Sequence, residues 1–234
     1  MFWPYHHFEN CIALRRCIDQ LFDRSCVTQE IRDRFYVHHK ALEHKLKSAQ
    51  YNLGKLTGLC ESTSLADLST SLSEFDFNAN LYIDGFFYNG GSALDIFARE
   101  VLALYSIQPT GDVHYSTARS EISNRYQSDP LLTRLDNPNW KGEFSNYRNA
   151  ATHEVLLSTS ISLNIQMTHP SQVQRINLPL PDNPRIAPSS RTFTRNRDAV
   201  KYCTTTFKRL LRHINIIYGE IANRALANGR LPLP

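Results

Sequence analysis

Apolar positions along most of the chain recur every three or four residues, which is the spacing of an amphipathic helix. The pattern predicts four long helices over residues 28–61, 75–106, 139–158 and 195–227, and a shorter one over residues 5–23. The stripe of the first long helix consists of Ile31, Phe35, His38, Leu42, Ala49, Leu53 and Leu56. Because such stripes are best buried against one another, the pattern predicts an all-α fold built as a four-helix bundle.

The period of the pattern changes between the third and the fourth long helix. Residues 160–167 and 173–180 alternate apolar and polar side chains, which predicts the two strands of a β-hairpin. Several prolines in and after the second of these segments predict an extended loop. We therefore expect a single helical domain over residues 1–234, with the hairpin insertion at about 159–190, before the last helix.

Two connecting segments complete this organisation. The Ser/Thr-rich residues 62–73 predict a loop or a broken turn. Residues 107–138 carry turn signals around an extra short helix near residues 115–127. The second long helix is interrupted by Gly85, Gly90 and Gly91. Since glycine costs about 1 kcal/mol relative to alanine inside a helix, these glycines predict close packing or a kink.

The composition is that of an ordinary soluble globule, with 41% hydrophobic and 21% charged residues. The net charge of +4 permits an anionic partner but does not require one. Of the basic residues 19 are Arg and 7 are Lys, and the planar guanidinium of Arg is the better phosphate ligand. The same residues could equally be surface charges and helix-end charges.

Several other classes of protein are disfavoured. The five cysteines are odd in number and form no C-x-x-C pair, so we expect neither a disulfide framework nor a structural zinc site. The pairs His6-His7 and His38-His39 lack a carboxylate at ligand spacing, and we expect no metal and no other cofactor. Without a signal-peptide pattern or a run of about 18 apolar residues, the chain is expected to be cytoplasmic and to have no membrane partner.

The candidate chemistry lies in the sequence NYRNAATHEV, residues 146–155, where Arg148 and His153 stand five positions apart. This spacing alone carries no weight, because a chain with 19 Arg and 9 His contains such pairs by chance. Arg34 and His39 have the same spacing. Bulky residues lie between Arg34 and His39. The helical phase there makes His38, rather than His39, the core-facing position.

The context of Arg148 is different. A helix turns about 100° per residue, so Asn149 and His153 share one face, and the long Arg148 side chain can reach back toward it. Ala150 and Ala151 are small enough to let a ligand or another backbone approach. Acidic partners for this pair could come from the second long helix, at Asp95 and Glu100. Alternatively, these two carboxylates are solvated or form salt bridges along their own helix.

These residue types suit the cleavage of RNA, which carries its own nucleophile, the 2′-hydroxyl beside the scissile phosphate. Histidine titrates near neutral pH and can act as a general base or acid. Arginine stays charged and binds phosphate oxygens as a fork. Asn149 can hold a phosphate or a ribose by hydrogen bonds. No step of this chemistry requires a metal ion.

The R-N-x-x-x-H string on the third long helix, with Trp140 and Tyr147 before it, resembles the HEPN superfamily of helical domains. The resemblance includes the insertion of extended structure before the last helix. It implies a metal-independent ribonuclease with Arg148, Asn149 and His153 as catalytic residues. It also implies a homodimer whose motif helices face each other. Tyr147 and Thr152, which neighbour the motif, are expected to contact the substrate.

The sequence therefore predicts a HEPN-type endoribonuclease that binds and cuts RNA, such as a toxin or a defence effector restrained by an antitoxin or another partner. An alternative is a non-catalytic HEPN module that binds RNA or a nucleotide, or that dimerises beside a nucleotidyltransferase-like partner. A helical scaffold without a ligand is the third possibility. Intact Arg148, Asn149 and His153 favour the first, because a silent module need not keep them.

Overall fold

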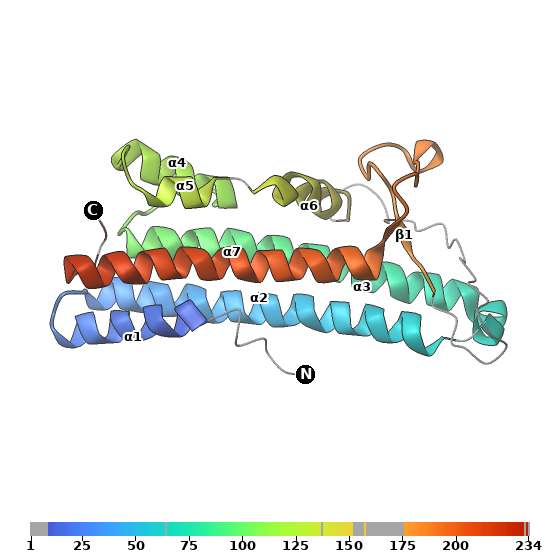
Figure 1. The fold of residues 1–234 in the computed structure, drawn as a ribbon, viewed down its shortest axis with the longest axis horizontal. Coiled ribbons are helices and arrows are strands. Elements are labelled where there is room, and N and C mark those ends of the chain that lie inside the picture. The colour runs from blue at the N-terminus through green and yellow to red at the C-terminus, as the bar shows by residue number, and fades with distance from the viewer. Residues whose placement is uncertain are drawn as a thin grey trace. The chain divides into compact units, whose positions relative to one another are not determined.

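The computed structural model describes residues 9–63, 65–136, 138–151, 157, 176–231 and 233 (Figure 1). This part of the chain is mostly helical, which confirms the all-α character. Its helices are α1 (Glu9–Asp23), α2 (Gln29–Ser62), α3 (Leu65–Leu104), α4 (Tyr115–Arg125), α5 (Leu131–Leu135), α6 (Asn139–Asn149), the 3-10 helix η3 (Pro188–Ser190) and α7 (Ala199–Asn228). Among them, none combines the length and the apolar character needed to cross a membrane.

The chain divides into two compact units. Unit 1 comprises Met1–Leu46, Ser92–Pro138 and Lys208–Pro234, and unit 2 comprises Lys47–Gly91 and Asn139–Phe207. Helices α2, α3 and α7 are each divided between the two units, with one segment in unit 1 and another in unit 2. The organisation of residues 1–234 as a single HEPN-like domain stays a prediction.

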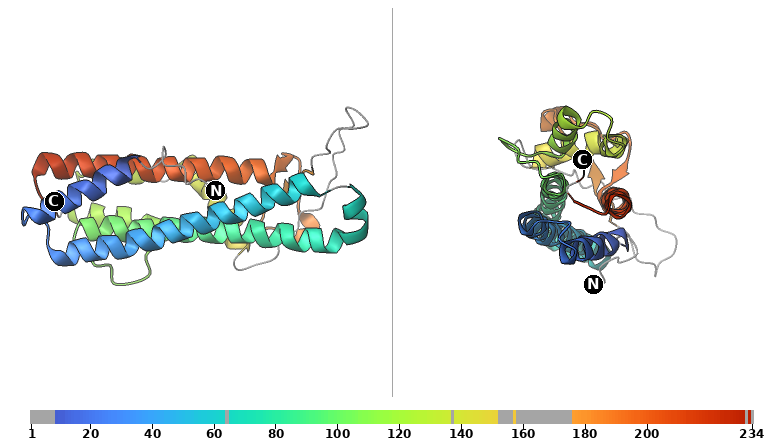
Figure 2. Two further views of the ribbon diagram at one scale, coloured as in Figure 1. Left: turned by 90° about the horizontal axis from the view of Figure 1, so that it is seen from below. Right: turned by 90° about the vertical axis from the view of Figure 1, so that its left-hand side faces the viewer.

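Unit 1 is a helical bundle in which segments of α1, α2, α3 and α7 lie side by side (Figure 2). The helix α1 contacts α7 at Asn10, whose backbone N–H donates to Oδ1 of Asn215 and whose side-chain amide donates to the Asn215 carbonyl oxygen, both at 3.0 Å. Gly219 permits this approach, because a Cβ atom there would lie 2.5 Å from the Asn10 amide nitrogen. The fourth helix of this bundle is α1, whereas the predicted helix over 139–158 corresponds to α6 of unit 2.

A buried polar cluster crosses the core of unit 1. The Nδ1 atom of His39 lies 2.9 Å from Oε1 of Glu100, and the hydroxyl of Tyr218 donates to Oε2 of the same carboxylate at 2.9 Å. The Sγ atom of Cys11 lies 3.4 Å from Nε2 of His39. Burial by itself would lower the pKa of His39, but its hydrogen bonds with Cys11 and Glu100 raise this pKa to about 10.

Two sequence-based expectations are therefore wrong. His39 is only 4% exposed, whereas His38 is half-buried, because the buried face of α2 advances from Phe35 by four residues to His39 and then by three to Leu42. Glu100 is neither solvated nor paired along its own helix, since it is fully buried against α2 and α7. Asp95 instead accepts the Tyr115 backbone N–H at 3.0 Å, at the start of α4.

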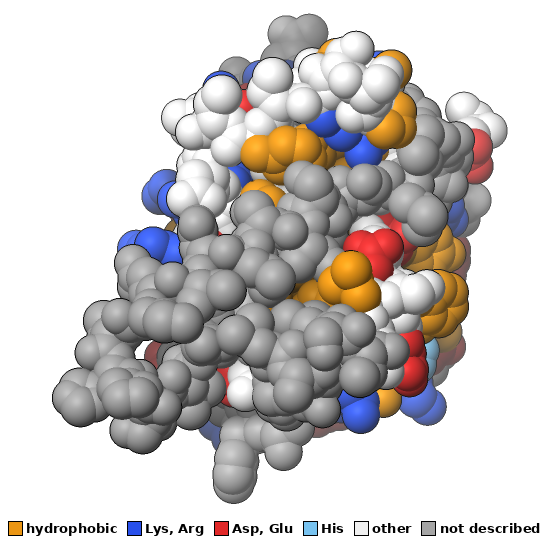
Figure 3. All heavy atoms as spheres, turned by 90° about the vertical axis from the view of Figure 1, so that its right-hand side faces the viewer, with side chains coloured by type: hydrophobic (Ala, Val, Ile, Leu, Met, Phe, Trp, Pro, Cys, Tyr) orange, Lys and Arg blue, Asp and Glu red, His pale blue; other side chains and the backbone are white. Residues whose placement is uncertain are grey.

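The core of unit 2 is aromatic. Rings from three helices pack with centroid separations of 5.2–6.5 Å, namely Phe86 and Phe87 of α3, Phe144 and Tyr147 of α6, and Tyr202 and Phe207 of α7. Of the interrupting glycines of α3, Gly90 permits this packing, because a Cβ atom there would lie 2.9 Å from Cζ of Phe144. Hydrophobic side chains also reach the surface, between charged ones, on the face drawn in Figure 3.

The structure describes two of the predicted connections in part. In the predicted stretch 62–73, α2 ends at Ser62 and α3 begins at Leu65, so its described part is mostly helical, and the kink at Ser71 (φ −136°, ψ 36°) corresponds to the broken turn that was the alternative to a loop. Leu65, Leu68 and Leu72 keep a helical spacing within this Ser/Thr-rich stretch. Of the predicted hairpin, residues 160–167 lie outside the described part of the chain. The described strand β1 (Pro179–Leu180) pairs antiparallel with β2 (Arg197–Asp198), so the last helix begins at Ala199 instead of 195.

Candidate functional site

The helix α6 carries the first residues of the motif. Its buried side, with Phe144 and Tyr147, packs into the aromatic core of unit 2. Asn149 is half-buried at the end of the helix, and Ala150 and Ala151 continue the backbone in π-helical conformation. Such single π-helical turns inside or after α-helices occur frequently at functional sites.

Arg148 is positioned by α3. A Cβ atom on Gly91 would lie 2.8 Å from Cγ, 3.0 Å from Nε and 3.2 Å from Cδ of the Arg148 side chain. The aliphatic part of this side chain therefore crosses α3 at a position that only glycine leaves open, and the residue remains half-buried. Close packing at Gly91, expected from the sequence, thus fixes the path of the candidate catalytic arginine.

Tyr147, expected to contact the substrate, is fully buried. Its hydroxyl donates to the Pro181 carbonyl oxygen at 2.6 Å and accepts from Nη1 of Arg197 at 3.2 Å. Its ring stacks on Phe87 with centroids 5.3 Å apart. Burial raises the pKa of this tyrosine. Through these contacts Tyr147 connects α6 to the loop that precedes α7.

The other two residues of the predicted site, Thr152 and His153, lie outside the residues that the structure describes. The relation of His153 to Arg148 and Asn149 therefore stays a prediction. Asp95 and Glu100, considered as orienting carboxylates, have the partners in unit 1 given above.

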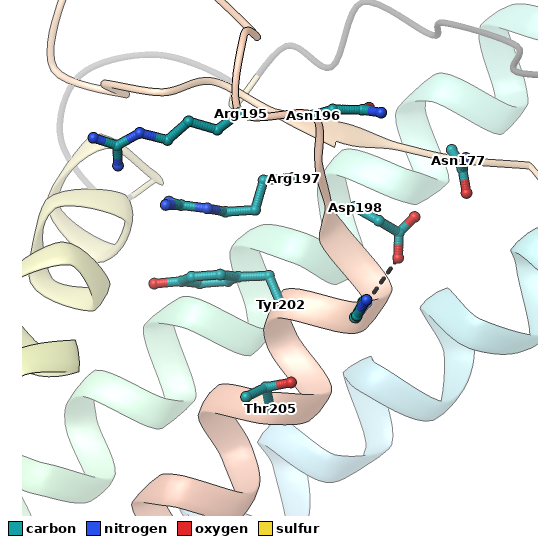
Figure 4. A pocket seen from close by; sticks show the side chains of 8 residues that line it. Asn177, Arg195, Asn196, Arg197, Asp198, Tyr202 and Thr205 are labelled. Atoms are coloured by element: carbon teal, nitrogen blue, oxygen red, sulfur yellow. Dashed lines mark hydrogen bonds between the residues drawn. The ribbon is translucent and has the colours of Figure 1, made fainter.

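The sequence did not predict a pocket of about 480 Å³ in unit 2 (Figure 4). It is lined by Asn177, by residues 195–198, and by Lys201, Tyr202 and Thr205 of α7. Arg195, Arg197 and Tyr202 point to one side, toward α6, and Asn196 points to the other (Figure 4). Asn196 has a left-handed backbone with φ of 42°, a conformation that asparagine tolerates better than most residues.

The two arginines share one acidic partner on α6. Nη1 of Arg197 lies 2.5 Å from Oε1 of Glu143, and Nη1 of Arg195 lies 3.3 Å from the same oxygen. The side chain of Lys201 has no carboxylate within ion-pair distance among the described residues. Asp198 caps α7, since its Oδ1 accepts the Lys201 backbone N–H at 2.8 Å. Three cationic side chains thus line this pocket beside one carboxylate.

The loop that presents the arginines is fastened at Asp182. Its carboxylate accepts hydrogen bonds from the Thr194 hydroxyl at 2.6 Å, the Thr194 N–H at 2.9 Å, the Thr192 hydroxyl at 2.8 Å and the Arg195 N–H at 2.9 Å. These bonds, that of the Thr194 hydroxyl above all, hold the pKa of Asp182 well below its usual range. The pairing of β1 with β2 closes the same loop at its base.

The pocket had a signal in the sequence. The string RNRD, residues 195–198, places two arginines two positions apart, immediately before the start of a helix. Glu143, which contacts both arginines, is more than fifty residues away along the chain. Only the fold therefore shows that the two arginines share a single carboxylate.

Comparison with known proteins adds no relative. No protein-family model matches the chain, and no curated protein and no solved structure matches it either. Within the described residues, no three His, Cys, Asp or Glu side chains gather closely enough to hold a metal ion.

Proposed function

We propose that the protein is a metal-independent endoribonuclease of the HEPN type, in which Arg148, Asn149 and His153 form the catalytic site. The observation that carries the proposal is the R-N-x-x-x-H string at the end of α6, with its arginine held over Gly91. Five positions separate Arg148 from His153 in the sequence, and the described part of the motif changes from α-helical to π-helical conformation after Asn149. The basic pocket beside α6 adds a surface that suits a phosphate chain.

In the proposed reaction, the imidazole of His153 takes the proton of the 2′-hydroxyl. The 2′-oxygen then bonds to the adjacent phosphorus while the bond from phosphorus to the 5′-oxygen breaks. The protonated imidazole, or its counterpart in a second protomer, returns a proton to the leaving 5′-oxygen. Arg148 stabilises the negative charge on the phosphorane, and Asn149 holds the phosphate or the ribose. The products are a 2′,3′-cyclic phosphate and a 5′-hydroxyl.

A second candidate function is a non-catalytic module that binds RNA or a nucleotide. The basic pocket favours it, because Arg195, Arg197 and Lys201 supply cationic binding groups and the lining of the pocket contains no histidine. In both versions we infer a homodimer. An antitoxin or a nucleotidyltransferase-like protein is the partner that would restrain or assist it in the cell.

Incubation of the protein with total RNA in the presence of EDTA separates the two candidates. The ribonuclease proposal expects cleavage by the wild type and a loss of about 10²–10⁴-fold in His153→Ala. His44→Ala serves as the matched control, because His44 is an exposed histidine of α2 in unit 1. Equal cleavage by wild type and His153→Ala contradicts the assignment, and no cleavage by either leaves the binding module as the better function.

A further inference from the structure

We propose that the pocket around Arg195, Arg197 and Lys201 is a binding subsite for a phosphate group of single-stranded RNA. The inference rests on the proposed function and extends it by naming where the strand is held outside the catalytic residues.

The volume and the charge of the pocket fit a nucleotide. Its volume of about 480 Å³ lies within the range of about 300–1,000 Å³ that is typical of small-molecule sites. The lining carries three cations and one carboxylate, that of Asp198. Glu143, which contacts the two arginines from α6, still leaves the group with one surplus positive charge. An anion is therefore the ligand that the electrostatics favour.

The arginines keep hydrogen-bond donors available for that anion. Both bind Glu143 through Nη1, and Arg197 also binds the Tyr147 hydroxyl through Nη1. Their Nε and Nη2 groups make no hydrogen bond to any residue in the described part of the chain. Two adjacent N–H groups of a planar guanidinium match two oxygens of a phosphate, which makes phosphate the best fit.

The pocket also offers a guanidinium plane on which a base can stack, because the side chain of Arg195 is 60% exposed. The guanidinium of Arg197 lies over the Tyr202 ring, 5.3 Å from its centroid, and Figure 4 shows Arg195, Arg197 and Tyr202 pointing the same way. Single-stranded RNA is commonly held by bases that stack on aromatic rings and on arginine planes beside a basic groove. A nucleotide, and not a bare inorganic anion, uses both the donors and this surface.

The position of the pocket relates it to the motif. Glu143, which receives both arginines, stands five residues before Arg148 on the same helix. Five helical residues rise about 7.5 Å, so a strand of a few nucleotides can contact both places. Pocket, Glu143 and Arg148 all belong to unit 2.

The test is a binding measurement with Lys201→Glu. Lys201 is exposed in the first turn of α7, where an acidic residue favours the helix, so the variant is expected to fold. The probe is a ten-nucleotide, fluorescein-labelled RNA with 2′-O-methyl groups, which cannot be cleaved through its 2′-oxygens. Fluorescence anisotropy should show a dissociation constant raised on the order of three- to tenfold, with a weaker salt dependence.

Control variants test whether the position of the charge matters, and competitors test whether the pocket requires an RNA strand. Lys40→Glu makes the same charge change at an exposed position of α2 in unit 1 and should leave the dissociation constant unchanged. Arg195→Gln, which retains an uncharged polar side chain, should weaken binding in the same direction as Lys201→Glu. Inorganic phosphate and AMP are added as competitors, and both are expected to displace the RNA only at much higher concentration than unlabelled RNA.

The outcomes distinguish this proposal from the ribonuclease proposal. If the wild type binds the probe and Lys201→Glu weakens it while no RNA is cut, the subsite stands and the ribonuclease proposal falls. If the wild type cuts RNA but Lys201→Glu changes neither binding nor the KM of cleavage, the subsite is refuted alone. Displacement by AMP or phosphate as readily as by RNA also overturns it, since the pocket would then serve a small anion.

Discussion

Gly91→Ala tests the role of Arg148 without altering any group that touches RNA. The added Cβ atom would lie 2.8 Å from Cγ of Arg148, whereas ordinary contacts begin at 3.4 Å. The arginine side chain must therefore move by at least about 0.6 Å, and its guanidinium, two bonds further on, by more. A displacement of about 1 Å in a catalytic group can cost on the order of 10²-fold in rate.

The same substitution should leave the fold stable. Replacing glycine by alanine inside a helix gains up to about 1 kcal/mol. Forcing Arg148 away from its present rotamer costs about 0.5–1.5 kcal/mol. The two effects nearly cancel, so the free energy of unfolding should stay within about 1 kcal/mol of the wild-type value. Urea denaturation followed by circular dichroism measures it.

The activity should fall by about 10–100-fold in an RNA cleavage assay under single-turnover conditions. Gly58→Ala is the matched control, because Gly58 lies in α2 of unit 2 and its added Cβ would meet nothing within 4 Å. Wild-type cleavage by a stable Gly91→Ala protein would refute the reasoning, and so would an equal loss of activity in Gly58→Ala.

Three further predictions concern the buried cluster and the chemistry. Because the pKa of His39 is raised to about 10, the protonated imidazole stabilises the fold fully below pH 6.5, and this stabilisation is lost as the pH rises through 10. Urea denaturation should give a free energy of unfolding that is a few kcal/mol lower at pH 10 than at pH 6. This difference should shrink in His39→Leu. Mixing inactive Arg148→Ala and His153→Ala subunits should restore part of the activity if a homodimer shares its cleft, whereas a fully active monomer in light scattering would exclude sharing. A single 2′-deoxy substitution at the cut site should block cleavage, and hydrolysis at that site would indicate a different mechanism.

The periodicity of apolar residues was sufficient to predict most helices but not their phase in detail. It placed α2 and α7 close to their observed bounds, because long stripes constrain a helix strongly. It assigned His38 instead of His39 to the core, because an imidazole gives no hydrophobic signal and its partner Glu100 lies on another helix. Such a polar pair is visible only once the two helices are packed.

The candidate site was predictable only where it lies within one helix. Arg148 and Asn149 stand out as neighbours in the sequence, and helical periodicity placed them within a helix over 139–158, although it did not predict that α6 ends at Asn149. The pocket combines residues from the loop, from α7 and from an isolated position, Asn177. No local pattern encodes that combination, because it depends on the pairing of β1 with β2 and on the contact of Arg197 with Glu143.

The fastening of the loop at Asp182 has a consequence for the entropy of ligand binding. Four hydrogen bonds to one carboxylate and the closure by β1 and β2 fix the backbone that carries Arg195 before any ligand arrives. A loop that must order itself on binding loses conformational freedom at that moment, and this loss subtracts from the affinity. Here the ordering has already occurred during folding. A ligand of the pocket therefore immobilises mainly side chains. Removal of the Asp182 carboxylate should weaken the affinity for this ligand, although no contact between the protein and the ligand is removed.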